Sequence, residues 1–551
     1  MQKIMEQFSV QVRRSDPREA ATDLYCIILL CLFPLFPGFS GYTNITFSKY
    51  VFLLAATALW LVALLVLTLR RRLPLPRFGT AQLAALAFLL LSVLSALISP
   101  WFPETVLGAG RWDGLLTTAV YCSIFLGVSL FTRPKPLHIY ALGLAVTLCC
   151  AVALLQLLGR NPLGLYPDGL RYADAGVRYS GVYLGTIGNT NLLDAVLCLA
   201  VPLCVCEILK RRFLFLIPYA LSVVVLAKAG GSGAALALAC FVLAALLILP
   251  RGRTARIVCA ALAALLALAA LFILRFWRGT EGTLYEISQV LRGHVEDSFG
   301  SSRIRIWREC LALFPQRPLL GGGPGTVASR LSIEFSRFVP ETGATLRSYA
   351  DNAHNVYLGY LVNVGVLGLA SYLSLLVLAL LCGLRRGRRS SLPRMLVLSV
   401  LCGAVHAFFG LGLCLTEPLF FALLGLCATV DPPQRAAKGA LRLPSARTAA
   451  VTAALVVLIA ALAIARTPAP APAETAPPAE PSPAATLPAT PSPVVTPPSA
   501  EPSAPSAAES PAPSPAPSTQ PPAITPPAVS AASGSEIILE PVMPATGSDA
   551  D

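Results

Sequence analysis

The chain has 551 residues, of which 55% are hydrophobic and only 13% are charged. Apolar runs of about 17–25 residues alternate with short polar connections, and this is the length that crosses roughly 30 Å of hydrocarbon. Such a pattern excludes a soluble globular fold, because a soluble core does not need so many long uncharged runs. We therefore predict an all-α, polytopic membrane protein.

Thirteen segments have the apolar character of membrane helices, which predicts a bundle of about 12–13 transmembrane helices. They are 23–36, 49–69, 80–99, 114–131, 137–158, 190–209, 213–228, 232–249, 255–276, 354–383, 394–412, 414–430 and 448–465. A secretory signal peptide is not expected, because no small-residue cleavage site follows the first apolar run.

The net charge of +14 is unevenly distributed along the chain. No Lys or Arg follows Arg466, and eight acids do, which leaves 42 bases against 20 acids before that point. Most bases lie in alternate short loops, at 70–77, 132–136, 210–212, 250–256, 384–394 and 431–447. The positive-inside rule predicts that these loops are cytoplasmic and that the intervening ones are extracytoplasmic. Since topology accounts for the bases, no nucleic acid partner is expected.

Composition also predicts the organisation of the chain. The expected parts are a cytoplasmic N-terminus (1–22), a block of about nine membrane helices (23–276), an extracytoplasmic loop (277–353), a second block of about three helices (354–430), a basic loop with a last helix (431–465) and a Pro/Ala/Ser/Thr-rich tail (466–551). The tail is predicted to be disordered, because it has too few large apolar residues to offset its ordering entropy. It is extracytoplasmic if 448–465 crosses the membrane, and cytoplasmic otherwise.

Cysteine spacing predicts neither a disulfide framework nor a metal site. Fourteen of the 15 cysteines lie within or at the ends of apolar runs, and Cys310 lies in the large loop. We interpret them as small apolar fillers, and we expect no metal and no cofactor.

The loop 277–353 is the only long hydrophilic interval among the apolar runs, and it is rich in arginine. Its run SSRIRIWREC holds Arg303, Arg305 and Arg308. The apolar residues of this stretch recur at helical spacing and predict a short amphipathic helix with Arg303 beside its stripe; they are Ile304, Trp307, Leu311 and Phe314. The glycines of GGGPG, at 321–325, permit a tight turn or a close approach to a ligand.

Two interpretations of these arginines remain open. The positive-inside rule gives no reason for arginine on an outer face, whereas the guanidinium fork matches two phosphate oxygens. Phosphate binding is therefore predicted, for Arg303 first of all. Eight acids in the same loop also allow ordinary surface ion pairs.

His354 stands at the start of the apolar run 354–383. A neutral imidazole there could accept a proton from an attacking hydroxyl, with Asp351 or Tyr349 to orient it. The alternative is a histidine that only caps a helix. The other three histidines are expected to be structural or at the surface: His294 on the loop surface, His138 at a cytoplasmic helix start and His406 packed in mid-helix.

The segments SSRIRIWRECLALFPQRPLLGGGPG and AHNVYLGYLVNVGVLGL, about 30 residues apart, resemble the signature region of the O-antigen ligase and polymerase (Wzy-type) superfamily. The run GTIGNTNLLDAVLCLAVPL at 185–203 is similar to the family's G-N-P-N segment, with Thr190 in place of the proline. The resemblance covers about residues 180–380 and leaves out 467–551.

This resemblance implies a GT-C-type membrane glycosyltransferase that moves glycan from an undecaprenyl-pyrophosphate carrier to an acceptor hydroxyl at the outer face of the cytoplasmic membrane. The acceptor would be a lipid, another glycan or the cell wall. The implied catalytic residues are Arg303 and His354, and the implied pyrophosphate-binding residues are Arg303, Arg305, Lys228 and Arg178. The supporting residues are Asn189, Asn191, Asp351, Asn355, Gly323 and Gly325. Because a lipid pyrophosphate is a good leaving group and no D-x-D cluster lies in an outer loop, a metal-independent reaction is expected.

The sequence departs from the family at one short outer turn. Members commonly have S-R-G-A before the eighth helix, whereas this chain reads KAGGSGAAL, with Ser232 at the position of the arginine. Lys228, one helical turn earlier, or Arg178 would have to supply the missing charge.

Three functions remain open. A ligase and a repeat-unit polymerase share the donor and the fold, and the sequence does not separate them. A lipid flippase or transporter generally needs ionisable groups near the membrane midplane. The candidates here lie mostly near helix ends and favour a transferase; they are Asp194, Glu207, Lys228, His406 and Glu417.

Overall fold

The computed structural model describes residues 16–74, 76–166, 173–174, 177–178, 185–339 and 344–430. The predicted helix 448–465 and the predicted tail lie outside these residues. The chain divides into two units, 1–454 with 530–551 and 455–529, and all described residues belong to the first. Helices dominate the described part, with two short antiparallel strand pairs beside them, so the predicted all-α class is confirmed.

Every predicted helix that falls on described residues is present, with shifted ends. The first part of the chain forms α2 (Pro17–Ile27), the π-helical turn η1 (Ile28–Leu32), α3 (Phe33–Leu35), α4 (Ile45–Arg70), α5 (Thr80–Leu97), α6 (Phe102–Leu107), α7 (Leu115–Phe131), α8 (Pro136–Leu157), β1 (Ala173–Asp174), β2 (Val177–Arg178) and α9 (Thr190–Leu209). The remainder forms α10 (Leu216–Ala229), α11 (Ser232–Ile248), α12 (Arg253–Arg275), α13 (Thr283–Leu291), α14 (Phe299–Leu313), β3 (Glu334–Val339), β4 (Ala344–Tyr349), α15 (Val356–Gly387), α16 (Ser391–His406) and α17 (Glu417–Cys427).

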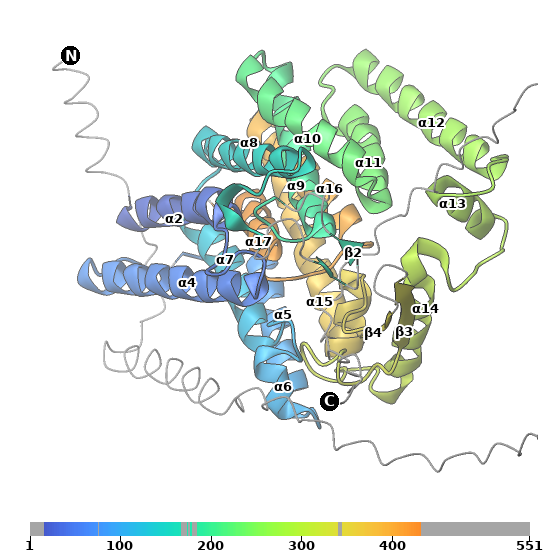
Figure 1. Ribbon diagram of the computed structural model, residues 1–551. Helices are drawn as coiled ribbons and strands as arrows, with labels where there is room; N and C mark the ends of the chain where they lie inside the picture. Colours follow the sequence, from blue (N-terminus) through green and yellow to red (C-terminus); the bar gives the residue numbers. More distant parts are fainter. Residues whose placement is uncertain are drawn as a thin grey trace, which may run out of the picture. The chain divides into compact units, whose positions relative to one another are not determined.

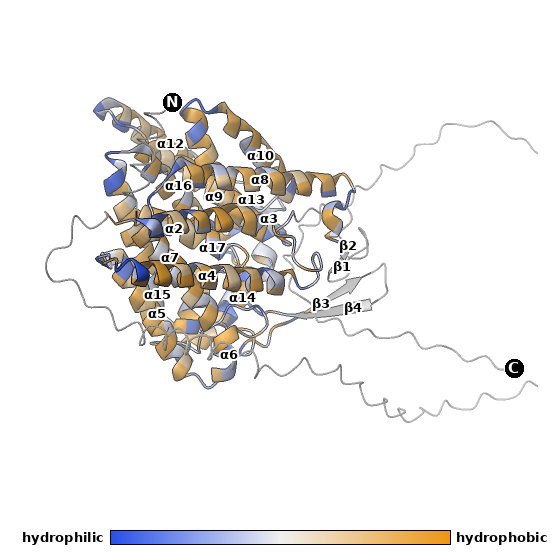
Figure 2. Ribbon diagram, turned by 90° about the vertical axis from the view of Figure 1, so that its left-hand side faces the viewer, coloured by the Kyte–Doolittle hydropathy of each residue, from blue (hydrophilic) through white to orange (hydrophobic). Residues whose placement is uncertain are grey.

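Six of the described helices are long and apolar enough to cross a membrane, and five shorter apolar helices have 10–17 residues. The six are α4, α5, α8, α9, α12 and α15. Figure 2 shows apolar residues along the helices and hydrophilic ones gathered at helix ends. The protein is therefore a multi-pass helical membrane protein.

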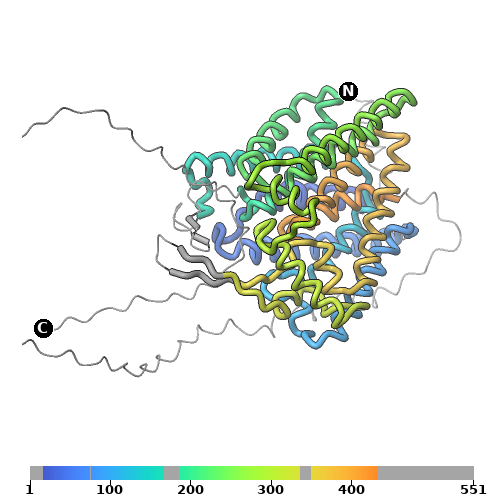
Figure 3. The backbone as a smooth tube through the Cα atoms, turned by 90° about the vertical axis from the view of Figure 1, so that its right-hand side faces the viewer, coloured from blue at the N-terminus to red at the C-terminus, as the bar shows by residue number. Residues whose placement is uncertain are grey.

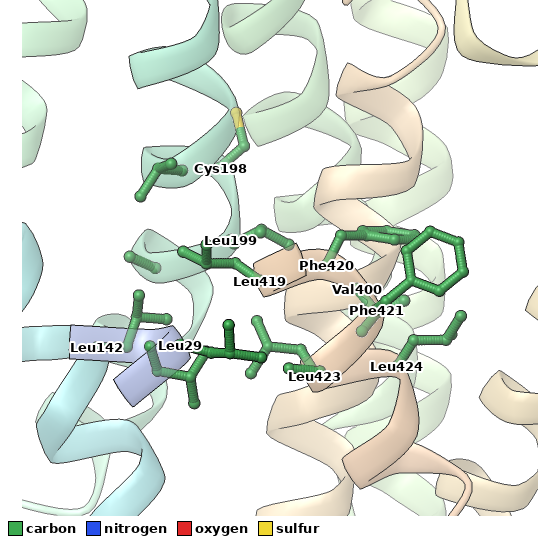
Figure 4. Close-up of a cluster of buried hydrophobic side chains, with 14 of the residues drawn as sticks. Leu29, Leu142, Cys198, Leu199, Val400, Leu419, Phe420, Phe421, Leu423 and Leu424 are labelled. Atoms are coloured by element: carbon green, nitrogen blue, oxygen red, sulfur yellow. The ribbon is translucent and has the colours of Figure 1, made fainter. Parts of the chain in front are cut away.

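The helix α9 is the most enclosed of the six, because it packs against α16, α10, α8 and α11. Its Cys198 and Leu199 belong to one buried apolar cluster with Val400 of α16 and Phe420 of α17 (Figure 4). The helix α12, by contrast, has its main packing contacts with α11 and α13 and lies at the margin of the described helices (Figures 1 and 3).

None of the fifteen cysteines, all of which lie in the described residues, forms a disulfide, and twelve of them are buried, as expected of apolar fillers. Cys310 is fully buried in a separate small cluster that the loop builds on the first turns of α15.

Connections meet at two opposite ends of the helices. The loop end comprises residues 98–114, 277–339, 344–355 and 407–416, which are joined by bonds such as Ala109 N to Gly325 O (2.8 Å) and Val356 N to Ala407 O (3.0 Å). The basic end comprises 71–74, 132–135, 210–213, 249–252 and 388–390, with bonds such as Arg18 Nη1 to Pro74 O (3.1 Å). For these connections the grouping agrees with the alternation of charge, and the side of the membrane on which each end lies stays a prediction.

The predicted single helix 354–383 is interrupted. Within α15, Gly365 has φ 73° and ψ −176°, so the helix breaks there into two parts. Backbone groups freed by the break bond to the stretch that precedes and includes the glycine loop: Gly322 N donates to Val362 O (3.0 Å), Gly323 N to Asn363 O (2.8 Å) and Val366 N to Pro318 O (2.8 Å). Non-helical backbone within the membrane is tolerated where other protein groups satisfy its hydrogen bonds, and here the glycine loop supplies those groups.

The glycine loop therefore joins the large loop to the membrane helices, in addition to being a candidate ligand contact. Gly323 has φ 114° and packs against Ser99 and Thr105, while Gly325 has φ 67° and packs against Gly108. A side chain at either glycine would meet these neighbours and would also strain the backbone. Both glycines hold the large loop onto the ends of α5 and α6.

The predicted apolar stripe of the loop helix needs correction. In α14 the buried residues are Phe299, Ile306 and Cys310, whereas Leu311 is 52% exposed. The helix turns the Ile306–Cys310 face to the underlying cluster, because Gly300, Ser301 and Ser302 adopt left-handed φ values and the regular turns begin only at Arg303. Arg303 lies one turn before Ile306 and therefore on the covered side.

Candidate functional site

Arg303 occupies the start of the regular part of α14. Its Nη1 donates to Gly300 O (3.0 Å), and its Nε is buried with no hydrogen-bond partner among the described residues. No carboxylate of the described chain forms an ion pair with it. Burial lowers the pKa of Arg303, although the charge of Glu286 opposes this shift. A guanidinium in this position keeps N–H donors that can bind an anion.

Backbone strain marks both sides of this site. Ser301 and Ser302 have φ of 58° and 63°, and His354 has φ of 48°, values that cost a non-glycine residue roughly 1–2 kcal/mol each. Strained residues of this kind cluster at functional sites.

His354 lies in the turn before α15 and is 5% exposed. Its backbone N–H donates to Asn352 Oδ1 (3.0 Å). The helix cap is Asn355, whose Oδ1 accepts from Tyr357 N and Leu358 N (both 3.0 Å). The alternative interpretation of His354 as a mere cap therefore fails, because the next residue does the capping.

The imidazole of His354 is held neutral. Burial, as the largest cause, and the positive charges of Arg303 and Arg111 together lower its pKa to about 3. The structure thus brings Arg303 close enough to His354 for charge to matter, which is the pairing that the sequence predicted. A neutral imidazole can accept or donate one hydrogen bond, but it is a weak base.

Arg111 is a component that sequence reasoning missed. It lies in the connection between α6 and α7, is 7% exposed, and its Nε forms an ion pair with Asp351 Oδ2. Asp351 was expected to orient His354, but this contact gives it a different partner, and Tyr349 is 58% exposed. The signal was available, because an arginine in the predicted outer loop 100–113 also has no topological explanation.

Asp113 lies two residues beyond Arg111 in the same connection. A Cβ on Gly108 would stand 2.5 Å from Asp113 Oδ1, and one on Gly325 would stand 2.9 Å from it, so two glycines make room for this oxygen. Burial raises the pKa of Asp113 to about 6; its own backbone N–H and Arg111 oppose the rise, and Asp351 adds to it. Its carboxylate titrates close to neutrality.

Aromatic side chains link α14 to the ends of the membrane helices. Trp307 packs edge-on against Phe408 (5.4 Å between ring centroids) and near Phe409 (6.2 Å). Tyr357 of α15 approaches Phe408 as well (6.3 Å). This contact holds the helix of Arg303 over the start of α15.

His406 is the last residue of α16 and does not stand in mid-helix as expected. It is 4% exposed and lies within electrostatic range of Arg303. It lines a small cavity together with Glu417 at the start of α17, whose Oε2 has no described partner. His138 and His294 lie where the sequence placed them, at the start of α8 and on the exposed loop.

Of the remaining predicted cations, Arg305 and Lys228 do not join Arg303 in the described part of the chain. Arg305 is exposed and lies over the ring of Phe335 (5.4 Å). Lys228 is exposed in the last turn of α10, a helix that packs against α8 and α9. Arg178 falls in β2, paired with Ala173, and its side chain lies outside the described residues.

The supporting residues of the G-N-P-N-like segment have structural roles. Asn189 caps α9, where its Oδ1 accepts from Asn191 N (2.9 Å) and Leu192 N (3.2 Å). Ser232, at the position of the family's arginine, is the first residue of α11. Asp194 of α9 packs against the neighbouring Gly231, so a carboxylate stands beside that turn.

The fold and this arrangement define a class: a multi-pass helical membrane protein with an anion-ready arginine and a neutral histidine at one end of its bundle. Residues 217–373 match the family model described as O-Antigen ligase. This match supports the predicted resemblance to the O-antigen ligase and polymerase family, and the matched segment contains both Arg303 and His354. Arg111, Asp113, His406 and Glu417 lie outside the matched segment, which covers less than a third of the chain. No curated protein matches the chain.

Proposed function

We propose that the protein transfers a glycan from a polyprenyl-pyrophosphate carrier to an acceptor hydroxyl, as a ligase. The family match supports a membrane glycosyltransferase of the ligase or polymerase type. The observation that carries the proposal is the buried, partnerless Nε of Arg303, next to His354 within the matched segment.

The chemistry is a substitution at the anomeric carbon of the donor sugar. The acceptor oxygen forms the new bond, and the bond from that carbon to the pyrophosphate breaks with its electron pair on phosphate oxygen. Charge develops on the leaving diphosphate, so a fixed cation in a partly dehydrated place lowers the barrier. Arg303 supplies that cation and needs no reorganisation to do so.

His354 orients the acceptor in this scheme. Its neutral imidazole donates a hydrogen bond to the oxygen of the attacking hydroxyl and holds that oxygen in line with the breaking bond. Because the protonated imidazole is disfavoured by burial and by two arginines, His354 positions the hydroxyl and does not store its proton.

The reaction belongs to the outer face of the cytoplasmic membrane. Bases gather in the connections of the basic end, and the positive-inside rule supports a cytoplasmic position for that end. Impermeant labelling of a cysteine introduced at exposed Arg308 of α14 tests this orientation in intact cells. Labelling only after the cells are opened would reverse it.

Carrier-linked glycan in cells tests the function itself. Cells that carry Arg303→Ala should accumulate the same long carrier-linked chains as cells without the gene. Cells with Arg308→Ala should behave as wild type, because Arg308 is exposed and already pairs with Asp297 (2.7 Å). Accumulation of single repeat units would identify a polymerase, and no accumulation at all would favour a flippase or transporter.

A further inference from the structure

A second polar site lies beside His354, away from Arg303. Its interpretation rests on the proposed function. A cavity opens between the starts of α7 and α15, and its polar lining includes Asp113, Tyr121, Asn352, Asn355, Tyr360 and Asn363. His354 does not line it, although the residues on either side of His354 do. The chain therefore places amides, phenols and one carboxylate next to the turn that carries the histidine.

This lining matches the chemistry of sugar hydroxyls. Amide and phenol groups both donate and accept hydrogen bonds, as hydroxyl groups do. The Oη of Tyr121 is buried without a hydrogen-bond partner among the described residues, and the Tyr121 side chain is 4% exposed. Buried hydroxyls are normally satisfied, so this atom indicates a ligand or solvent partner.

Asp113 is the one carboxylate of the cavity, and the backbone fixes its position. Its Oδ1 lies against Gly108 and Gly325, and Ala109 N donates to Gly325 O (2.8 Å) beside it. The glycine loop of the family-matching segment thus sets the place of an acid that lies far away in the sequence. The groups that face Asp113 are Arg111, Asp351, Tyr121 and Tyr360.

We propose that this cavity receives the hydroxyl-bearing end of the acceptor, and that Asp113 takes the proton of the attacking hydroxyl. The acceptor O–H bond breaks as its oxygen bonds to the anomeric carbon, and the proton passes to the Asp113 carboxylate. The electron pair of the breaking sugar–phosphate bond leaves with the lipid diphosphate. Asp113 then returns the proton to water or to that diphosphate, so no other reactant is needed.

The alternative base, His354, is less suited to this transfer. A general base works best when its pKa lies near the working pH. Asp113, with a pKa raised to about 6, meets this condition, whereas His354, with a pKa lowered to about 3, does not. The two residues divide the task, because His354 orients the oxygen and Asp113 receives the proton.

The first test compares Asp113→Asn with the exposed Glu309→Gln. Membranes containing the full chain are supplied with undecaprenyl-pyrophosphate-linked glycan that bears a labelled sugar, and release of undecaprenyl pyrophosphate is followed from pH 5 to 8. Wild type and Glu309→Gln should lose activity below about pH 6, as the Asp113 carboxylate is protonated. Asp113→Asn should lose at least about 100-fold and show no acid limb. Activity within threefold of wild type, or an unchanged acid limb, would overturn the proposal.

Binding of undecaprenyl pyrophosphate to the purified variant separates this proposal from the proposed function. Asp113→Asn should bind it within twofold of wild type, which also shows that the variant is folded. If wild type itself neither binds the carrier nor releases it, the transferase function fails first. If wild type does both and Asp113→Asn is fully active, only the assignment of Asp113 fails.

The second test removes one oxygen atom from the cavity. Tyr121→Phe should require about tenfold more acceptor for half-maximal transfer, with the maximal rate nearly unchanged; membranes from cells that lack the gene serve as the acceptor source. Tyr140→Phe, on an exposed residue of α8, is the matched control. A Tyr121→Phe enzyme with wild-type acceptor dependence would show that the acceptor does not enter this cavity.

Discussion

The two ends of the bundle differ in whether their buried polar groups have hydrogen-bond or ion-pair partners. At the basic end, Asp23 accepts bonds from Thr132 and Lys135, and His138 Nε2 lies 3.2 Å from its Oδ1. Buried Glu207 is likewise matched, by Lys210 (3.0 Å) and Arg212 (2.7 Å). These networks tie the helices together.

At the loop end, several buried polar atoms have no partner among the described residues. They include Arg303 Nε, Tyr121 Oη, Asp351 Oδ1 and Glu417 Oε2. An unsatisfied buried group costs about 1–3 kcal/mol. Among the described residues, Arg394 Nε is the exception near the basic end, and most such atoms lie toward the loop end. The loop end therefore sacrifices stability where a ligand can restore it, and the difference separates scaffold from site.

Arg303→Ala should produce the largest effect and should affect activity alone. Removing a cation that faces developing charge typically costs about 10²–10³ in rate, or roughly 3–4 kcal/mol. Stability should stay the same or rise, because the variant removes an unsatisfied buried group. The measurements are transfer rate and thermal unfolding in detergent. A destabilised variant with normal activity per folded molecule would place Arg303 in the scaffold.

Asp23→Ala should give the opposite pattern at the basic end. Without this carboxylate, Lys135 keeps only Glu19 of its two ion-pair partners, and Thr132 and buried His138 each lose a partner. Loss of these bonds should cost about 1–2 kcal/mol of stability. Transfer activity per folded molecule should remain within threefold of wild type. Exposed Asp297→Ala is the control, and loss of activity without loss of stability would erase the distinction between the two ends.

Gly365→Ala should lower the stability of the protein and also loosen the attachment of the large loop. The added Cβ would meet the backbone of Leu319, and φ of 73° is unfavourable for alanine, so we expect about 2 kcal/mol of destabilisation. Release of the glycine loop from the helix break would also expose 277–339 to proteases. Gly359→Ala, in the same helix with open space around its Cα, is the control. A stable, protease-resistant Gly365→Ala protein would show that the bonds across the break in α15 do not anchor the loop.

The fold was predictable because hydrophobic length is a strong local signal. The runs that form α5, α7 and α9 appear almost at their predicted bounds. The break in α15 was not predictable, since Gly365 reads as an ordinary glycine in an apolar run until Pro318 and Gly322 bond across it. Similarly, Leu311 follows the helical period but is exposed, because left-handed residues before Arg303 reset the face of the helix.

The site divides in the same way. Arg303 and His354 lie in motifs, so the sequence could name them as candidates. Arg111 and Asp113 carry no motif, and the contact of Gly325 with their loop, together with the Arg111–Asp351 ion pair, brings them to His354. Arg305 shares its motif with Arg303 but turns toward Phe335, which spacing alone could have indicated.

The pH dependence of stability gives the smallest and most selective test of the loop end. His354 has an unfolded pKa of about 6.5 and a folded pKa lowered to about 3, so below pH 6.5 the unfolded chain binds the extra proton. The contribution of His354 to the free energy of unfolding is fully present above pH 6.5. Below that pH the free energy of unfolding should therefore decline, by up to about 1.4 kcal/mol per pH unit. Asp113, with its raised pKa, contributes the opposite slope below about pH 6, and comparison at each pH with His354→Gln cancels it. In denaturant titrations in detergent, His354→Gln should lack this decline. If both proteins declined equally from pH 7 to 5.5, His354 would be solvated and paired like the groups of the basic end.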